Sequence, residues 1–169
     1  MIVVEANVIA GITFKIRPVM PDDISFIACL EAETFPGDPW SEALLNDAAN
    51  HPDTVFLVAC PEPGKATCSD TENDLAGYCV VRTVLEEGSI DNICVAPLYR
   101  RQHLARRLLE HAVEQAKETH GAEAFTLEVR VSNTAARALY ESMGFVSEGI
   151  RPSYYAHPRE DAVIYRRFF

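Results

Sequence analysis

One stretch constrains the fold more than any other: residues 90–107, where an apolar segment meets a basic turn and then a helical pattern. The apolar segment ends at Pro97, and leucines and alanines recur every three or four residues over 104–116. This order predicts a strand that leads directly into the N-terminus of a helix. Such a terminus exposes unpaired backbone N–H groups and a partial positive charge, and arginines flank it, so the element suits a phosphate or pyrophosphate.

The turn resembles the acyl-CoA pyrophosphate loop of the GNAT family of N-acetyltransferases, whose pattern is Arg/Gln-x-x-Gly-x-Gly/Ala. Residues 100–105 read Arg-Arg-Gln-His-Leu-Ala, so His103 stands where the family usually has glycine. Glycine lets a backbone approach a phosphate closely, whereas histidine still offers its own backbone N–H. For this loop alone, a basic helix start without a ligand is the alternative interpretation.

Composition bounds the number of domains and the kind of partner. With 169 residues, 48% of them hydrophobic, the chain is long enough for one well-packed domain and short for two. We expect one domain over residues 14–169, preceded by an extension, residues 1–13, that is either a strand or a loosely held segment. The net charge of −10 argues against a nucleic-acid partner and favours a basic protein or peptide.

The cysteines and the first residues bear on location. Five cysteines without C-x-x-C spacing are typical of small core residues in a reducing cytosol, not of a zinc site. The start of the chain lacks a basic region, carries Glu5 inside its apolar run and is followed by no spanning segment. We therefore expect a cytoplasmic protein that uses no metal and has no membrane partner.

The first third of the chain predicts one strand and two helices. Residues 14–19 read as a strand, and a proline followed by two aspartates then predicts a helix start. Residues 35–40, Phe-Pro-Gly-Asp-Pro-Trp, are too rich in proline and glycine to continue that helix. Ser41 is predicted to cap a second helix, with Leu44 and Leu45 facing inward.

The 35–40 loop also bears on the substrate. GNAT enzymes that act on N-terminal amines have a shorter Phe-Pro-Trp-Ser-Glu stretch there, which flanks the substrate cleft. The resemblance implies that this loop, and Trp40 in it, contacts the substrate. For Trp40 the alternative is a side chain that fills the core.

Three more strands are predicted between the second helix and the helix that begins near residue 104. They cover residues 54–60, 75–84 and 89–96, and a turn at 86–88 joins the last two. The polar, acidic residues 61–74 are interpreted as a mobile hairpin tip.

Residues 125–131 alternate apolar and polar side chains, so one face of a predicted strand carries Glu128 and Arg130. A sheet covered by helices on both faces rarely places a charge there. We therefore expect Glu128 to line a cleft. An internal pair between Glu128 and Arg130 is the structural alternative.

The stretch at 133–145 reads Asn-Thr-Ala-Ala-Arg-Ala-Leu-Tyr-Glu-Ser-Met-Gly-Phe and fills every position of the family signature Asn-x-x-Ala-x-x-Leu-Tyr-x-x-x-Gly-Phe. The pair Ser132-Asn133 is predicted to cap a helix that ends at Gly144. The side chains expected to face inward are those of Ala135, Ala136, Leu139 and Met143. Tyr140 lies on this helix, and for it the alternative role is an ordinary aromatic anchor in the core.

Residues 149–162 are similar to the Arg-x-x-Tyr-Tyr and Glu-Asp-Ala pattern of GNAT enzymes that acetylate protein N-termini. The resemblance implies that Tyr154 and Tyr155 hold the incoming peptide. An aromatic loop that merely covers the sheet is the alternative.

The reaction itself defines the roles that the site must fill. An amine attacks a thioester only when it is neutral, so the site needs a base, donors for the oxyanion and an acid for the thiolate. We assign the base to Glu128 and the acid to Tyr140. An α-amine with a pKa near ~8 costs about 3 kcal/mol less to neutralise than a lysine near ~10.4, which favours an α-amine acceptor.

The resemblance as a whole implies the GNAT fold, a mixed α/β sheet flanked by helices, with acetyl-CoA as cosubstrate. It further implies transfer to a protein N-terminal α-amine, an N-terminal alanine of a ribosomal protein. An acetyltransferase of small-molecule amines and a non-catalytic acyl-CoA-binding module are the alternatives. The implied cofactor-binding residues are Ile93, Cys94, Val95, Arg101, Gln102, His103, Leu104, Ala105, Arg106 and Asn133.

Overall fold

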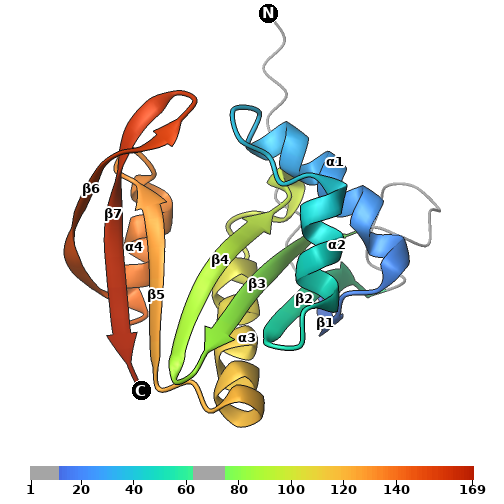
Figure 1. Ribbon diagram of the computed structural model, residues 1–169. Coiled ribbons are helices and arrows are strands. Elements are labelled where there is room, and N and C mark those ends of the chain that lie inside the picture. Colours follow the sequence, from blue (N-terminus) through green and yellow to red (C-terminus); the bar gives the residue numbers. More distant parts are fainter. Residues whose placement is uncertain (1–11, 63–74) are drawn as a thin grey trace, which may run out of the picture.

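The computed structural model describes residues 12–62 and 75–169, which form a seven-stranded sheet with helices on both faces (Figure 1). Most of the expected extension and most of the expected loop tip, residues 1–11 and 63–74, lie outside the described residues. The strand order is β1-β2-β3-β4-β5-β7-β6. The strands are β1 (Phe14–Pro18), β2 (Thr54–Pro61), β3 (Gly77–Val84), β4 (Glu87–Val95), β5 (Ala124–Arg130), β6 (Val146–Ala156) and β7 (Arg159–Phe168). The helices are α1 (Ile24–Thr34), α2 (Glu42–Asn50), α3 (Leu104–His120) and α4 (Thr134–Ser142), with short 3-10 turns at Pro21–Asp23 and Pro97–Tyr99.

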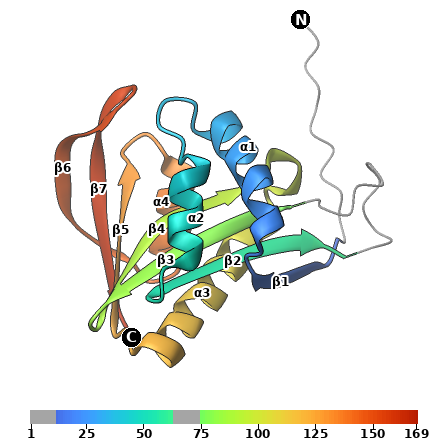
Figure 2. The same ribbon diagram turned by 45° about the vertical axis from the view of Figure 1, so that its right-hand side comes forward.

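The central strands β2 and β3 are buried on both faces because helices cover both sides and neighbouring side chains of a strand point to opposite sides. Along β2, Val55 and Leu57 pack into the core that α3 covers, whereas Phe56 and Val58 pack into the core that α1 and α2 cover. Figure 2 shows the resulting layers, with α1 and α2 in front of the sheet and α3 behind it. The predicted mixed α/β class with helices on both faces is confirmed. None of the described helices is long and apolar enough to cross a membrane.

Helix ends occur where local side-chain chemistry predicts them. The Ser41 hydroxyl accepts a 3.3 Å hydrogen bond from the Leu44 N–H at the start of α2. The Asn133 side chain accepts one of 3.1 Å from the Ala136 N–H at the start of α4. Gly121, with φ +69°, ends α3 in the left-handed conformation that favours glycine.

The turn between β3 and β4 differs from the prediction. It lies at Leu85 and Glu86, and Gly88 belongs to β4. A Cβ added to Gly88 would lie 2.5 Å from ring carbons of Phe125 on β5. Glycine is therefore needed here for close packing of two strands, which a sequence pattern does not distinguish from a turn signal.

Two side chains predicted to face inward are exposed. Leu45 is fully buried, but Leu44 is 45% exposed. Ala135 is likewise exposed, next to the half-buried Ala136. The cause is the same in both helices, because consecutive helical residues point about 100° apart and rarely share one buried face.

The described part of the sheet has one parallel pair, β4 with β5, and these two strands soon diverge (Figure 1). Their ladder comprises Glu87↔Ala124, Gly88↔Phe125 and Ser89↔Thr126. Beyond it β4 continues to Val95 and β5 to Arg130, each held by its other neighbour. The facing edges of these two strands are therefore left without a strand partner among the described residues.

Candidate active site

The basic turn before α3 has the geometry of an anion site. Arg101 and His103 both adopt the left-handed conformation, with φ of +64° and +57°. The first turn of α3 contains no acidic residue, and no side chain caps it. Because the first N–H groups of a helix have no intrahelical partner, this terminus presents donors and a partial positive charge.

The conformation of His103 explains why the family usually has glycine at this position. A left-handed backbone costs a residue with a side chain roughly 1–2 kcal/mol, and glycine avoids that cost. His103 adopts this conformation nonetheless. Histidine at this position therefore adds backbone strain that glycine would avoid.

Side chains of the loop both supply donors and fix the helix. The Nε2 atom of Gln102 is buried and has no hydrogen-bond partner in the part of the chain that the structure describes. A buried amide donor of this kind fits a ligand oxygen. Arg106 donates a 2.6 Å hydrogen bond to the Ser142 hydroxyl at the end of α4. Leu104 is buried and half-buried Ala105 follows it, so these two residues offer their backbone and not a polar side chain.

Three of the implied cofactor-binding residues, Ile93, Cys94 and Val95, lie on β4 beyond its ladder with β5. Cys94 is buried, and its Sγ lies 3.5 Å from the Thr34 hydroxyl. Burial raises the pKa of the Cys94 thiol to about 11, so it stays protonated at neutral pH and does not serve as a nucleophile. Ile93 and Val95 are half-buried and pack on the core. Residues 93–95 therefore turn the edge of their backbone toward β5.

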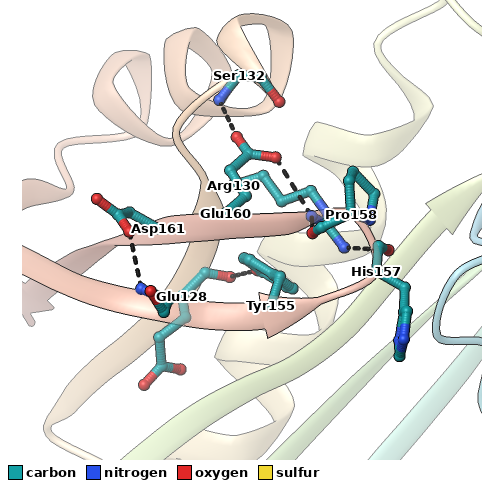
Figure 3. Close-up of polar contacts among 9 residues, drawn as sticks. Glu128, Arg130, Ser132, Tyr155, His157, Pro158, Glu160 and Asp161 are labelled. Atoms are coloured by element: carbon teal, nitrogen blue, oxygen red, sulfur yellow. Dashed lines mark hydrogen bonds and ion pairs between the residues drawn. The ribbon is translucent and has the colours of Figure 1, made fainter.

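Glu128 lies on β5 beside the divergence from β4. Its side chain is 26% exposed, and its carboxylate pairs with Arg151 of β6, with an N···O distance of 3.1 Å. Arg130, the alternative partner, pairs with Glu160 of β7 at 3.2 Å. Figure 3 shows the Glu128 side chain pointing away from that second pair. The internal Glu128–Arg130 pair is therefore not formed.

The two predicted peptide-binding tyrosines lie next to Glu128. The Tyr155 hydroxyl donates a 3.3 Å hydrogen bond to the backbone carbonyl of Glu128 (Figure 3). The Tyr154 ring meets the Tyr155 ring edge-on, with centroids 5.0 Å apart, and is more exposed. Burial, together with the neighbouring Tyr154, raises the pKa of Tyr155 to about 12. Tyr155 is thus protonated and held in place by its neighbours, and Tyr154 is the more accessible of the two rings.

Tyr140, the predicted acid, is buried on α4. Its ring packs against Phe145 and Tyr165, with centroids 6.0 and 6.3 Å away. Burial raises the pKa of its hydroxyl well above the ordinary value, and Cys79 and Tyr155 add to the rise. The hydroxyl therefore carries its proton at neutral pH, and it lies in the neighbourhood of Tyr155.

Trp40 lies on the other side of the divergence. Its side chain is half-buried against the core of α1 and α2, and it also lines a cavity of about 260 Å³ with Leu44 and Asp91. Its backbone N–H donates a 2.7 Å hydrogen bond to the Glu31 carboxylate. Trp40 is thus an anchor of the 35–40 loop as well as part of a cavity wall.

Sequence reasoning missed Glu31, whose side chain is fully buried. Besides Trp40, its carboxylate accepts hydrogen bonds from the Tyr78 hydroxyl and, at 3.2 Å, from the Asn92 amide. The network ties α1 and the 35–40 loop to β3 and β4. The available signal was a glutamate four residues after Ile27, on the apolar stripe of a helix.

Arg151 was also missed as the partner of Glu128. The register pairs Arg130 of β5 with Ala162 of β7, and Ala162 in turn with Arg151 of β6. Arg151 therefore reaches Glu128 from two strands away. Nothing local in the sequence encodes this register.

No group of three His, Cys, Asp or Glu residues that could hold a metal ion occurs among residues 12–62 and 75–169. A parallel strand pair that opens beside a helix start with the geometry of an anion site is typical of enzymes that transfer an acyl group from coenzyme A to an amine. The chain belongs to the acetyltransferase (GNAT) family, whose model matches residues 24–145. It is an acetyl-CoA-dependent N-acetyltransferase.

Particular members of the family are similar over most of the chain. The [ribosomal protein bS18]-alanine N-acetyltransferase of Escherichia coli is 40% identical over 128 residues, which cover 75% of this chain and 78% of that one. The crystal structure of the ribosomal-protein-S18-alanine N-acetyltransferase from Escherichia coli matches with a TM-score of 0.75 and 33% identity, covering 91% and 92% of the two chains. NAA60 of Arabidopsis thaliana, solved with a bisubstrate analogue, shares the fold, with a TM-score of 0.82 at 19% identity over 93% and 99% of the chains.

Proposed function

We propose that the protein acetylates the N-terminal α-amine of a ribosomal protein whose first residue is alanine. The observation that carries the proposal is the position of Glu128, a partly exposed carboxylate beside the diverging strands and next to Tyr154 and Tyr155. By this proposal, Glu128 is a proton acceptor that lies among aromatic side chains suited to a peptide. The name of the Escherichia coli relative, 40% identical, supports alanine as the first residue.

The start of α3 fits the pyrophosphate of coenzyme A. The backbone N–H groups at 104–106, the buried amide of Gln102 and the positive charge of Arg101 all belong to one helix terminus and the turn before it. By this proposal, His103 and Arg106 complete the cradle, the backbone of 93–95 lies along the pantetheine, and Asn133 gives a further contact. When bound, acetyl-CoA supplies a thioester carbonyl that a neutral amine attacks.

Glu128 has the role of general base. It takes a proton from the incoming ammonium, directly or through a water molecule. Arg151 holds the carboxylate in one place from the side of β6. An α-amine is the matching acceptor, because it loses its proton more readily than a lysine side chain does.

Tyr140 has the role of general acid. A tyrosine hydroxyl carries its proton at neutral pH, so Tyr140 can supply the proton that the departing thiolate needs. Its packing against Phe145 and Tyr165 fixes the direction of the ring. The base and the acid thus come from β5 and α4, two elements joined by a short connection.

The charge around Tyr154 favours a basic acceptor. Burial raises the pKa of Tyr154, and the carboxylates of Glu128, Asp91 and Asp38 add to the rise while Arg151 opposes it. With the net charge of −10, these carboxylates steer a basic peptide toward the site and speed the encounter. A ribosomal acceptor also places the enzyme in the cytoplasm.

The test is mass spectrometry after mixing enzyme, acetyl-CoA and an alanine-initiated basic peptide, beside the same peptide with a blocked N-terminus and free lysines. We expect acetylation of the free peptide only, slowed by added salt because screening shortens the reach of the field. Equal acetylation of the blocked peptide would identify a lysine acetyltransferase. Labelling of neither peptide, beside rapid acetylation of a small polyamine, would identify a small-molecule acetyltransferase.

A further inference from the structure

Two loops from opposite sides of the diverging strands touch each other. A Cβ added to Gly37, in the loop between α1 and α2, would lie 2.0 Å from the backbone carbonyl oxygen of His157, in the turn between β6 and β7. The backbone of one loop therefore packs directly on the backbone of the other. Figures 1 and 2 both show the two loops side by side at the end of the molecule where β4 and β5 are far apart.

Position 37 requires glycine because the two loop backbones lie so close together, not because of its own backbone torsion angles. Its φ lies outside the left-handed region, so other residues could adopt the torsion, and the position is exposed. Gly121 is the opposite case, since its φ is +69° and an added Cβ would meet nothing within 4 Å. Gly37 also belongs to the Gly-Asp-Pro segment that lengthens the loop between its Phe-Pro and Trp residues.

The turn that Gly37 meets is held in place by Arg130. The guanidinium donates hydrogen bonds of 3.0 Å to the carbonyls of both His157 and Pro158 (Figure 3). It also lies 4.0 Å over the Tyr155 ring. Its partner Glu160 accepts a 2.6 Å hydrogen bond from the Ser132 N–H. Arg130 thus connects the turn, the tyrosine pair and the start of α4.

We propose that Gly37 and His157 form a latch over the acceptor side of the site, and that Arg130 is the residue that positions it. The inference rests on the proposed function, because it assigns the latch to the peptide acceptor. The latch joins the Trp40 loop to the turn that follows Tyr154 and Tyr155 before any acceptor binds. The acceptor then does not have to order these loops, which lowers the free-energy cost of binding it.

The latch is expected to act on the acceptor and not on acetyl-CoA, because neither Gly37 nor His157 belongs to the proposed acetyl-CoA site. Gly37→Ala adds one methyl group that cannot fit against the His157 carbonyl, so the loops must separate. We expect the KM for an alanine-initiated peptide to rise roughly tenfold and the KM for acetyl-CoA to stay unchanged. Glu33→Ala, an exposed change on the last turn of α1, is the control and should leave both constants unchanged.

Arg130→Lys tests the positioning role. Lysine keeps the charge beside Glu160 but lacks the planar fork that binds two carbonyls. It should raise the peptide KM severalfold, and the double variant with Gly37→Ala should show less than the product of the two effects, because both changes open one contact. Should Gly37→Ala fail to fold, the single variant Arg130→Lys still tests the proposal.

Hydrogen exchange gives a readout that does not depend on the acceptor. Opening the latch should speed amide exchange in residues 35–40 and 154–158 together. An unchanged peptide KM, an equal rise in both KM values, or faster exchange in only one loop would overturn the latch. A wild-type enzyme that acetylates no peptide would overturn the proposed function instead, and the exchange experiment would still decide the latch.

Discussion

The region that carries the proposed cradle and the hairpin that faces the proposed acceptor are held together in different ways. Along α3, six side chains are buried against the sheet. Along β6, at the edge of the sheet, every residue is exposed or half-buried, and its side-chain contacts include an ion pair and an arginine–aromatic pair. Apolar burial stabilises far more than exposed ion pairs do, so we expect side chains of the first region to contribute more to stability than side chains of β6.

The largest expected contrast is in stability. Leu108→Ala, at a fully buried position of α3, should lower the free energy of unfolding by about 2–5 kcal/mol. Ile150→Ala, at a position of β6 that is 60% exposed, should change it by less than about 0.5 kcal/mol. Urea unfolding of both variants measures the difference. Comparable losses would remove the distinction between the two regions.

A smaller effect is expected from the buried ion pair between β1 and the start of α1. Arg17 lies 2.6 Å from Asp23, whose side chain is 4% exposed. Burial alone would raise the pKa of Asp23, but hydrogen bonds from Arg17 and the Met20 N–H outweigh it and lower the pKa. The pair therefore stabilises the fold above the unfolded pKa of about 3.9, and this contribution is lost as the pH falls through the folded pKa.

Asp23→Asn tests whether the charge of Asp23 stabilises the fold. We expect it to lower the free energy of unfolding at pH 7 by about 1–3 kcal/mol, because it weakens a charged hydrogen bond in a buried place. The difference from wild type should shrink as the pH falls below about 4. Urea unfolding across that range measures it, and a pH-independent difference would mean that the charge of Asp23 is not the cause.

The smallest expected effect is at His103. Glycine relieves the left-handed backbone strain in the loop, so His103→Gly should leave acetyl-CoA binding equal or tighter by up to roughly fivefold. Titration calorimetry measures the affinity, and the melting temperature should rise with acetyl-CoA by mass action. Weaker binding in the variant would show that the imidazole itself contacts the cofactor.

The parts of the fold that the sequence predicts are those that depend on neighbouring residues. Ser41, Asn133 and Gly121 mark helix ends because capping is a matter of a few adjacent groups. The turn before β4 was misplaced because Gly88 serves a contact with Phe125, which is far away in the chain.

The same limit applies to the candidate site. Glu128 is recognisable from its strand pattern, and Tyr140 from the family signature. The Arg151 partner, the Glu31 network and the contact of Gly37 with His157 depend on strand register and on how distant loops meet. Periodicity and local motifs carry no information on contacts between residues that are far apart in the chain.

The most direct test of the account measures single-turnover acetyl transfer to an alanine-initiated peptide by Glu128→Gln, together with the affinity for acetyl-CoA. Glu123→Gln, an exposed change just before β5, is the matched control. We predict a fall in rate of about 10²-fold or more, with unchanged acetyl-CoA binding, because the amide cannot accept the proton. A wild-type rate in Glu128→Gln would contradict the assignment of the base and, with it, the proposed site between β4 and β5.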